Sequence, residues 1–225
     1  MRPSHVVRIV AWILGCIAVP VMLRAELGRP WGAIGTLLVA VATGYLVLWL
    51  PRAAHRAFEV GKLARSHRIY RALELAAFTA RREQAARLSR AACQLAAGEL
   101  ATAERLLAAI DPARLDVAER VVWLNNRACA VLDASRDPHD ALALVEEATQ
   151  LRPDVPAVQH TRARALLAVG RVDDAITVLD AMRAGGELSP HLEAERCREL
   201  AAAWERKGQG DYAADYRERA RLHAS

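Results

Sequence analysis

The fold is decided by residues 165–182, which read ALLAVGRVDDAITVLDAM. This pattern predicts a helix, a glycine turn and a second helix. Gly170 can adopt the left-handed conformation that lets the chain reverse at the end of a helix. Ala175 is small, as required where two antiparallel helices approach closely. Leu179 and Met182 then continue the same face at helical spacing, so the stretch predicts a close-packed helical hairpin.

The same pattern recurs along the chain. The small residue returns at Ala103, Ala141, Ala175 and Ala213, which are spaced 38, 34 and 38 residues apart. The turn position is occupied by Gly98, Arg136, Gly170 and Gly208, and the later packing position by Leu107, Val145, Leu179 and Arg217. A sustained period near 34 residues resembles the tetratricopeptide repeat, in which each unit is a helical hairpin and neighbouring units stack.

The resemblance implies repeats at about 81–111, 115–151, 155–184 and 190–222. The composition agrees, because aromatic residues make up only 5% of the chain and no segment shows the alternation typical of strands. Arg217, a polar residue at a packing position, suits the capping unit that ends a solenoid. We therefore predict an all-α protein in which an α-solenoid of about four tetratricopeptide-like hairpins follows an N-terminal transmembrane hairpin.

Two apolar segments precede the repeats, at about residues 5–23 and 31–50. The second carries no charge, lies between Pro30 and Pro51, and has the length of about 20 residues that a bilayer requires. The first is shorter, and it spans only if Arg8 extends to the surface. We predict a transmembrane hairpin over residues 1–51, in which Ala40 and Gly44 allow close helix approach.

The first apolar segment has two alternative interpretations. A cleaved signal peptide would need a small-x-small site, which does not follow the segment. A lipoprotein signal is suggested by the sequence ILGC ending at Cys16, but apolar residues continue beyond that cysteine. Both alternatives fit the flanking sequence less well than a membrane span does.

A basic linker, residues 52–80, separates the hairpin from the repeat domain at 81–225. Its membrane-flanking basic residues are Arg52, Arg56, Lys62, Arg65, Arg68 and Arg71. Basic residues are retained on the cytoplasmic side of a membrane. We therefore predict a multi-pass protein of the cell (inner) membrane with both termini, Met1 and Ser225, in the cytoplasm. The basic flank is either a topology signal or a site for anionic lipids.

The sequence holds no catalytic constellation. The motif GQGDYA at residues 208–213 matches a dinucleotide fingerprint, but it follows a helix where that fingerprint requires a strand. The seven histidines and four cysteines have no metal-ligand spacing, and Cys16, Cys93, Cys129 and Cys197 are expected to be reduced thiols. Basic residues gather near the apolar segments and the repeats are mildly acidic, which argues against nucleic acid. We predict no enzyme activity, no cofactor and no metal.

The resemblance implies that the first helix of each repeat lines a partner-binding groove. The matching positions are Leu88, Leu95, Asn125, Asn126, His160, Arg164, Arg198 and Glu205. An asparagine amide both donates and accepts, so the Asn125–Asn126 pair suits a peptide backbone. Arg164 and Arg198 are candidates to bind a carboxylate.

These patterns predict a membrane-anchored scaffold that recruits a protein or peptide partner to the cytoplasmic face of the lipid bilayer. The alternative is a structural or regulatory subunit of a membrane enzyme complex that acts through its spans. The layout of two spans, an arginine-rich exit and repeats also resembles the HemY-type proteins of the bacterial inner membrane, most closely over Arg81–Leu107. The partner, the pathway and the oligomeric state are not specified by the sequence.

Overall fold

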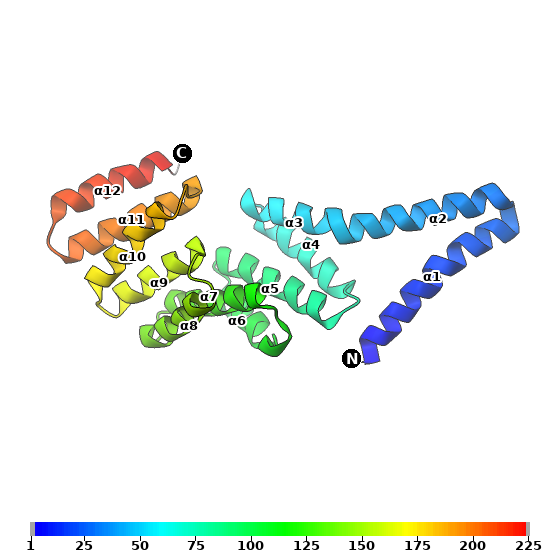
Figure 1. The fold of residues 1–225 in the computed structure, drawn as a ribbon, viewed down its shortest axis with the longest axis horizontal. Coiled ribbons are helices and arrows are strands. Elements are labelled where there is room, and N and C mark those ends of the chain that lie inside the picture. Colours follow the sequence, from blue (N-terminus) through cyan, green and yellow to red (C-terminus); the bar gives the residue numbers. More distant parts are fainter. Residues whose placement is uncertain (1–2, 224–225) are drawn as a thin grey trace. The chain divides into compact units, whose positions relative to one another are not determined.

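A computed structural model of the chain describes residues 3–223, except for the side chains at 3–6, 8, 9 and 184. Every regular element in this range is a helix, so the predicted all-α class is confirmed (Figure 1). The chain forms two compact units, Met1–Leu115 and Asp116–Ser225. Met1 and Ser225, whose location we predicted, lie outside the described residues.

Unit 1 begins with a helical hairpin made by α1 (Pro3–Leu27) and α2 (Arg29–Gly44). The helices meet at Gly32 and Gly35, where an added Cβ would lie 2.8 Å from Arg24 Cβ and 2.8 Å from Leu23 Cδ1. The prediction that Gly44 provides the close approach is wrong, because no heavy atom lies within 4 Å of a Cβ built there. The approach lies near the turn of the hairpin.

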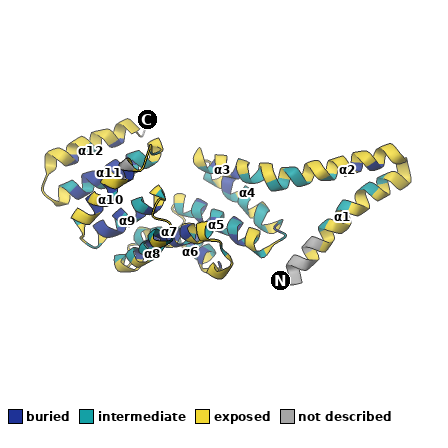
Figure 2. Cartoon of the chain, in the orientation of Figure 1, coloured by how far each residue is buried: buried dark blue, intermediate teal, exposed yellow. Residues whose placement is uncertain are grey.

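The two N-terminal helices expose their apolar side chains. The stretches Val10–Leu27 and Arg29–Glu59 are long and apolar enough to cross a membrane, and only 0% and 6% of their most apolar 18 residues are buried in the protein (Figure 2). Water would make such exposure unfavourable, whereas hydrocarbon would not.

The second of these helices does not end at Pro51. A five-residue π-helix, η1 (Tyr45–Trp49), follows α2, and α3 (Leu50–Glu59) continues directly from it. The amide of Leu50 donates to the carbonyl of Tyr45, five residues earlier. Proline lacks an N–H and crowds the preceding turn. The wider π turn accommodates it and carries the helix onward.

The segment predicted to be a basic linker is a packed hairpin of α3 and α4 (Leu63–Leu75). Its turn is Gly61, with a φ of 70°. Five residues later Ser66, fully buried, donates a 2.9 Å hydrogen bond to the carbonyl of Ala54. Gly61 and Ser66 repeat the spacing of Gly98 and Ala103, so this hairpin has the form of the repeats. The repeat spacing of alanines did not reveal this hairpin because the small residue here is serine.

The repeat hairpins follow, with α4 also packed against α5. Unit 1 adds α5 (Ala80–Ala96), α6 (Leu100–Ala108) and a short 3-10 turn, η2 (Pro112–Arg114). Unit 2 consists of α7 (Val117–Asp133), α8 (Pro138–Leu151), α9 (Pro156–Ala168), α10 (Val172–Ala184), α11 (Pro190–Arg206) and α12 (Gly210–His223).

The predicted packing positions are buried in these hairpins, except that Arg217 of the last repeat is exposed. Ala103, Ala141, Ala175 and Ala213 are each 0% exposed. The turn glycines Gly98, Gly170 and Gly208 have φ values of 75°, 82° and 73°. In the remaining repeat the left-handed residue is Ser135, with a φ of 52°, and not Arg136 as predicted. The loop there is one residue longer, which shifts the turn relative to Ala141.

Candidate functional site

The first helices of the three hairpins in unit 2 lie side by side, because α9 packs against both α7 and α11. On α7 the residues Asn126, Cys129 and Asp133 occupy one face at helical spacing. Cys129 Sγ lies 3.4 Å from Thr161 Oγ1 of α9, so this face of α7 is directed at α9. Asn126 belongs to the same stripe and is only 8% exposed.

The α9 side chains lie between those of α7 and α11. Arg164 Nη2 donates a 2.6 Å hydrogen bond to Asp133 Oδ1, and its Nε lies 3.8 Å from Glu199 Oε1 of α11. His160 precedes Arg164 by one turn on α9. Its electrostatic neighbours include Glu195, His191 and Arg198 of α11. We call the resulting polar stripe the first-helix surface; its members are Asn126, Cys129, Asp133, His160, Arg164, Glu195 and Glu199.

Three polar atoms at or beside this surface have no hydrogen-bond partner among the described residues. They are Asn125 Oδ1, Asn126 Nδ2 and His160 Nε2, each buried without a hydrogen bond among the described residues. A buried polar atom without a partner costs about 1–3 kcal/mol. Each atom is itself shielded from solvent, so a bound polar chain could pair with it, and remove that cost, only after the side chain rotates outward.

Burial shifts the pKa values of two titratable side chains at this surface, His160 and Glu199. Desolvation, helped by the positive charge of Arg164, lowers the pKa of His160 to about 4. The imidazole is therefore neutral at physiological pH and can either donate or accept at Nε2. Burial also raises the pKa of Glu199, which the positive charge of Arg164 partly offsets.

The arginines that we expected to bind a carboxylate already do so within the chain. Arg164 is engaged by Asp133 and Glu199, and Arg198 pairs with Glu195 on its own helix. An incoming carboxylate would have to displace one of these acidic groups. Asp133 and Glu199 were not among the predicted site residues, although Asp133 lies seven residues after Asn126 and thus on the same helix face.

The remaining predicted groove residues lie elsewhere. Leu88 and Leu95 belong to α5 in unit 1, where Leu88 is buried. Glu205 is near the end of α11, and its carboxylate accepts a 2.5 Å hydrogen bond from Arg217 of α12. The first-helix surface therefore contains Asn126, His160 and Arg164 of the predicted set, with Asn125 and Arg198 beside it.

The cysteines do not supply a reactive centre. All four are free, and burial raises the pKa of the Cys93, Cys129 and Cys197 thiols, which disfavours the nucleophilic thiolate. Within residues 3–223 no group of three His, Cys, Asp or Glu side chains is placed to hold a metal ion.

Stacked helical hairpins with a polar surface along their first helices form a tetratricopeptide-like solenoid, an architecture whose extended surfaces generally bind partners. A family model described as tetratricopeptide repeat matches residues 134–192, from just after α7 into α11. This match supports the resemblance drawn from the repeat spacing.

Solved structures of similar fold agree. Two crystal structures, one of them of a point variant, contain nearly identical TPR-like repeats of a candidate kinesin light chain from Podosopora anserina. The point variant has a TM-score of 0.54 and 22% identity, over 77% of this chain and 92% of that one. The other has a TM-score of 0.53 and 22% identity, over 78% and 93%. At this identity the likeness shows the fold. No curated protein matches the chain.

Proposed function

We propose that the protein is a membrane-anchored scaffold whose first-helix surface binds an extended segment of a partner protein at the cytoplasmic face. One observation supports this location of the binding site. Among the described residues, three buried polar atoms on two adjacent first helices have no hydrogen-bond partner: Asn125 Oδ1, Asn126 Nδ2 and His160 Nε2. An extended peptide presents alternating N–H and C=O groups. Once these side chains rotate outward, the three atoms can accept from and donate to such a backbone.

The charges of the surface select the kind of segment. Asp133, Glu195 and Glu199 outnumber Arg164 and Arg198, and both arginines are already paired. A segment with neutral or basic side chains therefore suits the surface better than an acidic one, because an acidic segment would meet excess carboxylate.

Membrane anchoring is supported by the N-terminal hairpin. Its apolar side chains are exposed along both helices. The six membrane-flanking basic residues that follow are all exposed, and none pairs with a carboxylate among the described residues. We place residues 1–51 in the membrane with the repeats on the cytoplasmic side, following the distribution of basic residues.

The test is quantitative affinity capture of the full-length protein from detergent-solubilised membranes. The variant Asn126→Ala/His160→Ala removes two of the three unpartnered groups, one on each helix, and Gln150→Ala/His139→Ala is the matched control on exposed positions of α8. We expect one or more partners to be lost at least tenfold with the first variant and kept with the control. Melting curves check that both variants remain folded.

Equal recovery of every partner by both variants would show that the surface is not the binding site. The alternative function, a subunit that acts through its spans, has its own signature. Partners would then be lost when residues 1–50 are exchanged for an unrelated hairpin, and they would be unaffected by the substitutions on α7 and α9.

A further inference from the structure

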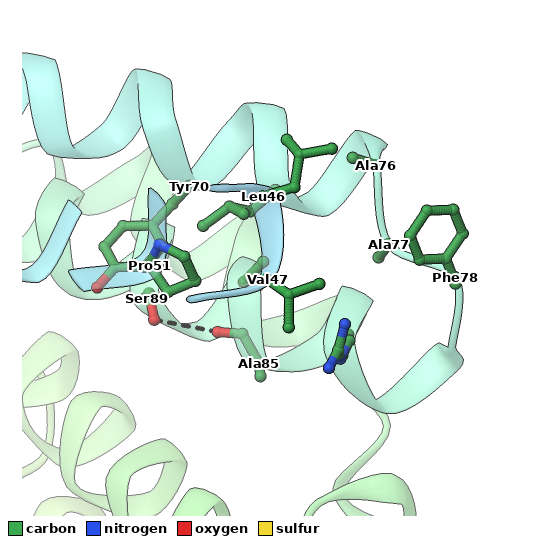
Figure 3. A pocket seen from close by; sticks show the side chains of 12 residues that line it. Leu46, Val47, Pro51, Tyr70, Ala76, Ala77, Phe78, Ala85 and Ser89 are labelled. Atoms are coloured by element: carbon green, nitrogen blue, oxygen red, sulfur yellow. Dashed lines mark hydrogen bonds between the residues drawn. The ribbon is translucent and has the colours of Figure 1, made fainter. Parts of the chain in front are cut away.

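Unit 1 contains an apolar pocket of about 360 Å³ where the second N-terminal helix meets the first repeats. One wall is made by Leu46 and Val47 of the π-helix with Pro51 of α3, and the opposite wall by α4, α5 and the loop between them (Figure 3). Tyr70, Pro51 and Ser89 group at one end, and Phe78 lies at the other. The volume is within the usual range of ligand sites, about 300–1,000 Å³.

The polar groups of this pocket are few. Ser89 Oγ donates a 3.1 Å hydrogen bond to the carbonyl of Ala85, so its proton is used within α5. Arg82 is the one charged residue among the lining residues, and its side chain is exposed. No ion pair joins the Arg82 guanidinium to a carboxylate among the described residues. The site therefore combines apolar walls with a single available cation.

The pocket lies at the end of the proposed membrane hairpin. Trp49, at the last turn of η1, is exposed and stacks on Tyr45 with ring centroids 4.8 Å apart. Trp12 of α1 contacts Phe78 at the pocket with centroids 5.3 Å apart. Aromatic side chains gather where hydrocarbon meets water. Arg52 and Arg56 follow within two turns, so in the proposed membrane orientation the pocket would lie near the boundary between hydrocarbon and headgroups.

We propose that this pocket holds one acyl chain of an anionic phospholipid, whose phosphate is bound by Arg82. The assignment rests on the membrane anchoring in the proposed function. Apolar walls fit a hydrocarbon chain, and the guanidinium of Arg82 complements a phosphate. The exposed basic residues of α3 and α4 raise the local concentration of anionic lipid, since each contributes attraction near the surface. A bound lipid would couple α2 and α3 to the first repeat.

The site can be tested with full-length protein in phosphatidylcholine nanodiscs that contain a small fraction of phosphatidylglycerol carrying a diazirine on its acyl chain. After irradiation, labelled peptides are mapped by mass spectrometry. We expect labelling within residues 46–51, 70–78 and 82–89 that is competed by unlabelled phosphatidylglycerol and much less by phosphatidylcholine.

Two pairs of variants sharpen the test. Ala85→Phe fills the pocket, and its control, Ala101→Phe, adds the same ring at an exposed position of α6. Arg82→Gln removes the proposed phosphate contact, and its control, Arg81→Gln, removes the neighbouring positive charge. We expect Ala85→Phe to abolish pocket labelling. Arg82→Gln should lower it about fivefold, the effect of roughly one basic residue near an anionic membrane.

The lipid site would be overturned by labelling confined to α1 and α2, by equal competition from phosphatidylcholine, or by unchanged labelling in both Ala85→Phe and Arg82→Gln. Competition by soluble glycerol phosphate alone would also overturn it, since it would indicate a simple anion site. Alkaline carbonate extraction separates this failure from failure of the proposed function. A chain that resists extraction but lacks pocket labelling refutes only the lipid site, whereas an extractable chain refutes the membrane anchoring as well.

Discussion

Arg164 of α9 and Asp133 of α7 are joined by an ion pair of 2.6 Å, and Glu199 of α11 lies 3.8 Å from the same guanidinium. One side chain thus links three consecutive first helices of unit 2. Because each hairpin of a solenoid contacts only its neighbours, such links between units add to stability directly.

Replacing this arginine should therefore weaken the stacking of unit 2. In Arg164→Met the carboxylates of Asp133 and Glu199 face each other without the cation between them. We expect a loss of about 1–2 kcal/mol, intermediate between an exposed and a buried ion pair. Thermal melting of the full-length protein in detergent measures it. Arg198→Gln, which breaks only the pair with Glu195 on the same helix, should change the melting temperature little; equal shifts would contradict the linking role.

The buried pair on α11 should matter more. Arg196 is 3% exposed in its side chain and donates to both Glu193 oxygens, at 2.8 and 2.7 Å, and to the carbonyl of Leu179 at 3.2 Å. Glu193→Ala leaves the buried guanidinium with only Asp180 as an acidic neighbour, at 3.9 Å and largely exposed, so we expect a loss of roughly 3 kcal/mol. Its matched control is Glu218→Ala, which removes the acid of an exposed pair at the same spacing with Arg221. A similar melting temperature for both variants would refute the prediction.

His160 should make the protein sensitive to acid. Its pKa is about 4 in the folded protein against 6.5 for the free side chain, so the unfolded chain binds more protons between these values. Stability should therefore fall as the pH drops from about 6.5 towards 4, by at most about 3 kcal/mol. The raised pKa of Glu199 acts in the opposite direction, because protonation is favoured in the folded state.

The contribution of His160 can be isolated by comparing wild type with His160→Gln. Stability of both is measured by chemical denaturation at a series of pH values from neutral down to the folded-state pKa of His160, about 4. The difference between the two should change across this window in the sense that the wild type loses more. A constant difference throughout would show that His160 does not titrate as described.

The N-terminal hairpin should depend on Gly35. A Cβ at this position would lie 2.8 Å from Leu23 Cδ1 and 3.1 Å from Pro20 Cα, so Gly35→Leu must separate the helices. We expect faster hydrogen exchange of the amides in residues 20–35 in detergent micelles. Gly44→Leu is the control, since its site has no neighbour within 4 Å. If the two substitutions had the same effect, the contact at Gly35 would not hold the hairpin together.

Topology provides a further prediction. Reporter fusions that are active only outside or only inside the cell are placed after Leu27 and after Ser225. We expect external activity at Leu27 and internal activity at Ser225, because six basic residues follow the second span and only two lie at the hairpin turn. External activity at Ser225 would reverse the orientation. Internal activity at Leu27 would leave the repeats in place and remove the hairpin.

The sequence by itself determined the repeat architecture of this protein. Small residues at Ala103, Ala141, Ala175 and Ala213 are required wherever two helices approach closely, and left-handed turns favour glycine at positions such as Gly98 and Gly170. Both requirements concern local backbone geometry and helix contact, so the same residue types recur in the sequence at the repeat period. The sequence also shows two apolar segments, one of them charge-free over the length that a bilayer requires.

Only the tertiary structure decided which side chains meet. The pairing of Arg164 with Asp133 and Glu199 joins residues 31 and 35 positions away, and no local rule selects those partners. The α3–α4 hairpin was also hidden, because its buried small residue is Ser66, whose hydroxyl is satisfied by the carbonyl of Ala54. The π turn that carries the helix across Pro51 likewise depends on backbone geometry. The pocket beside it exists only because α4 and α5 fold back against that turn.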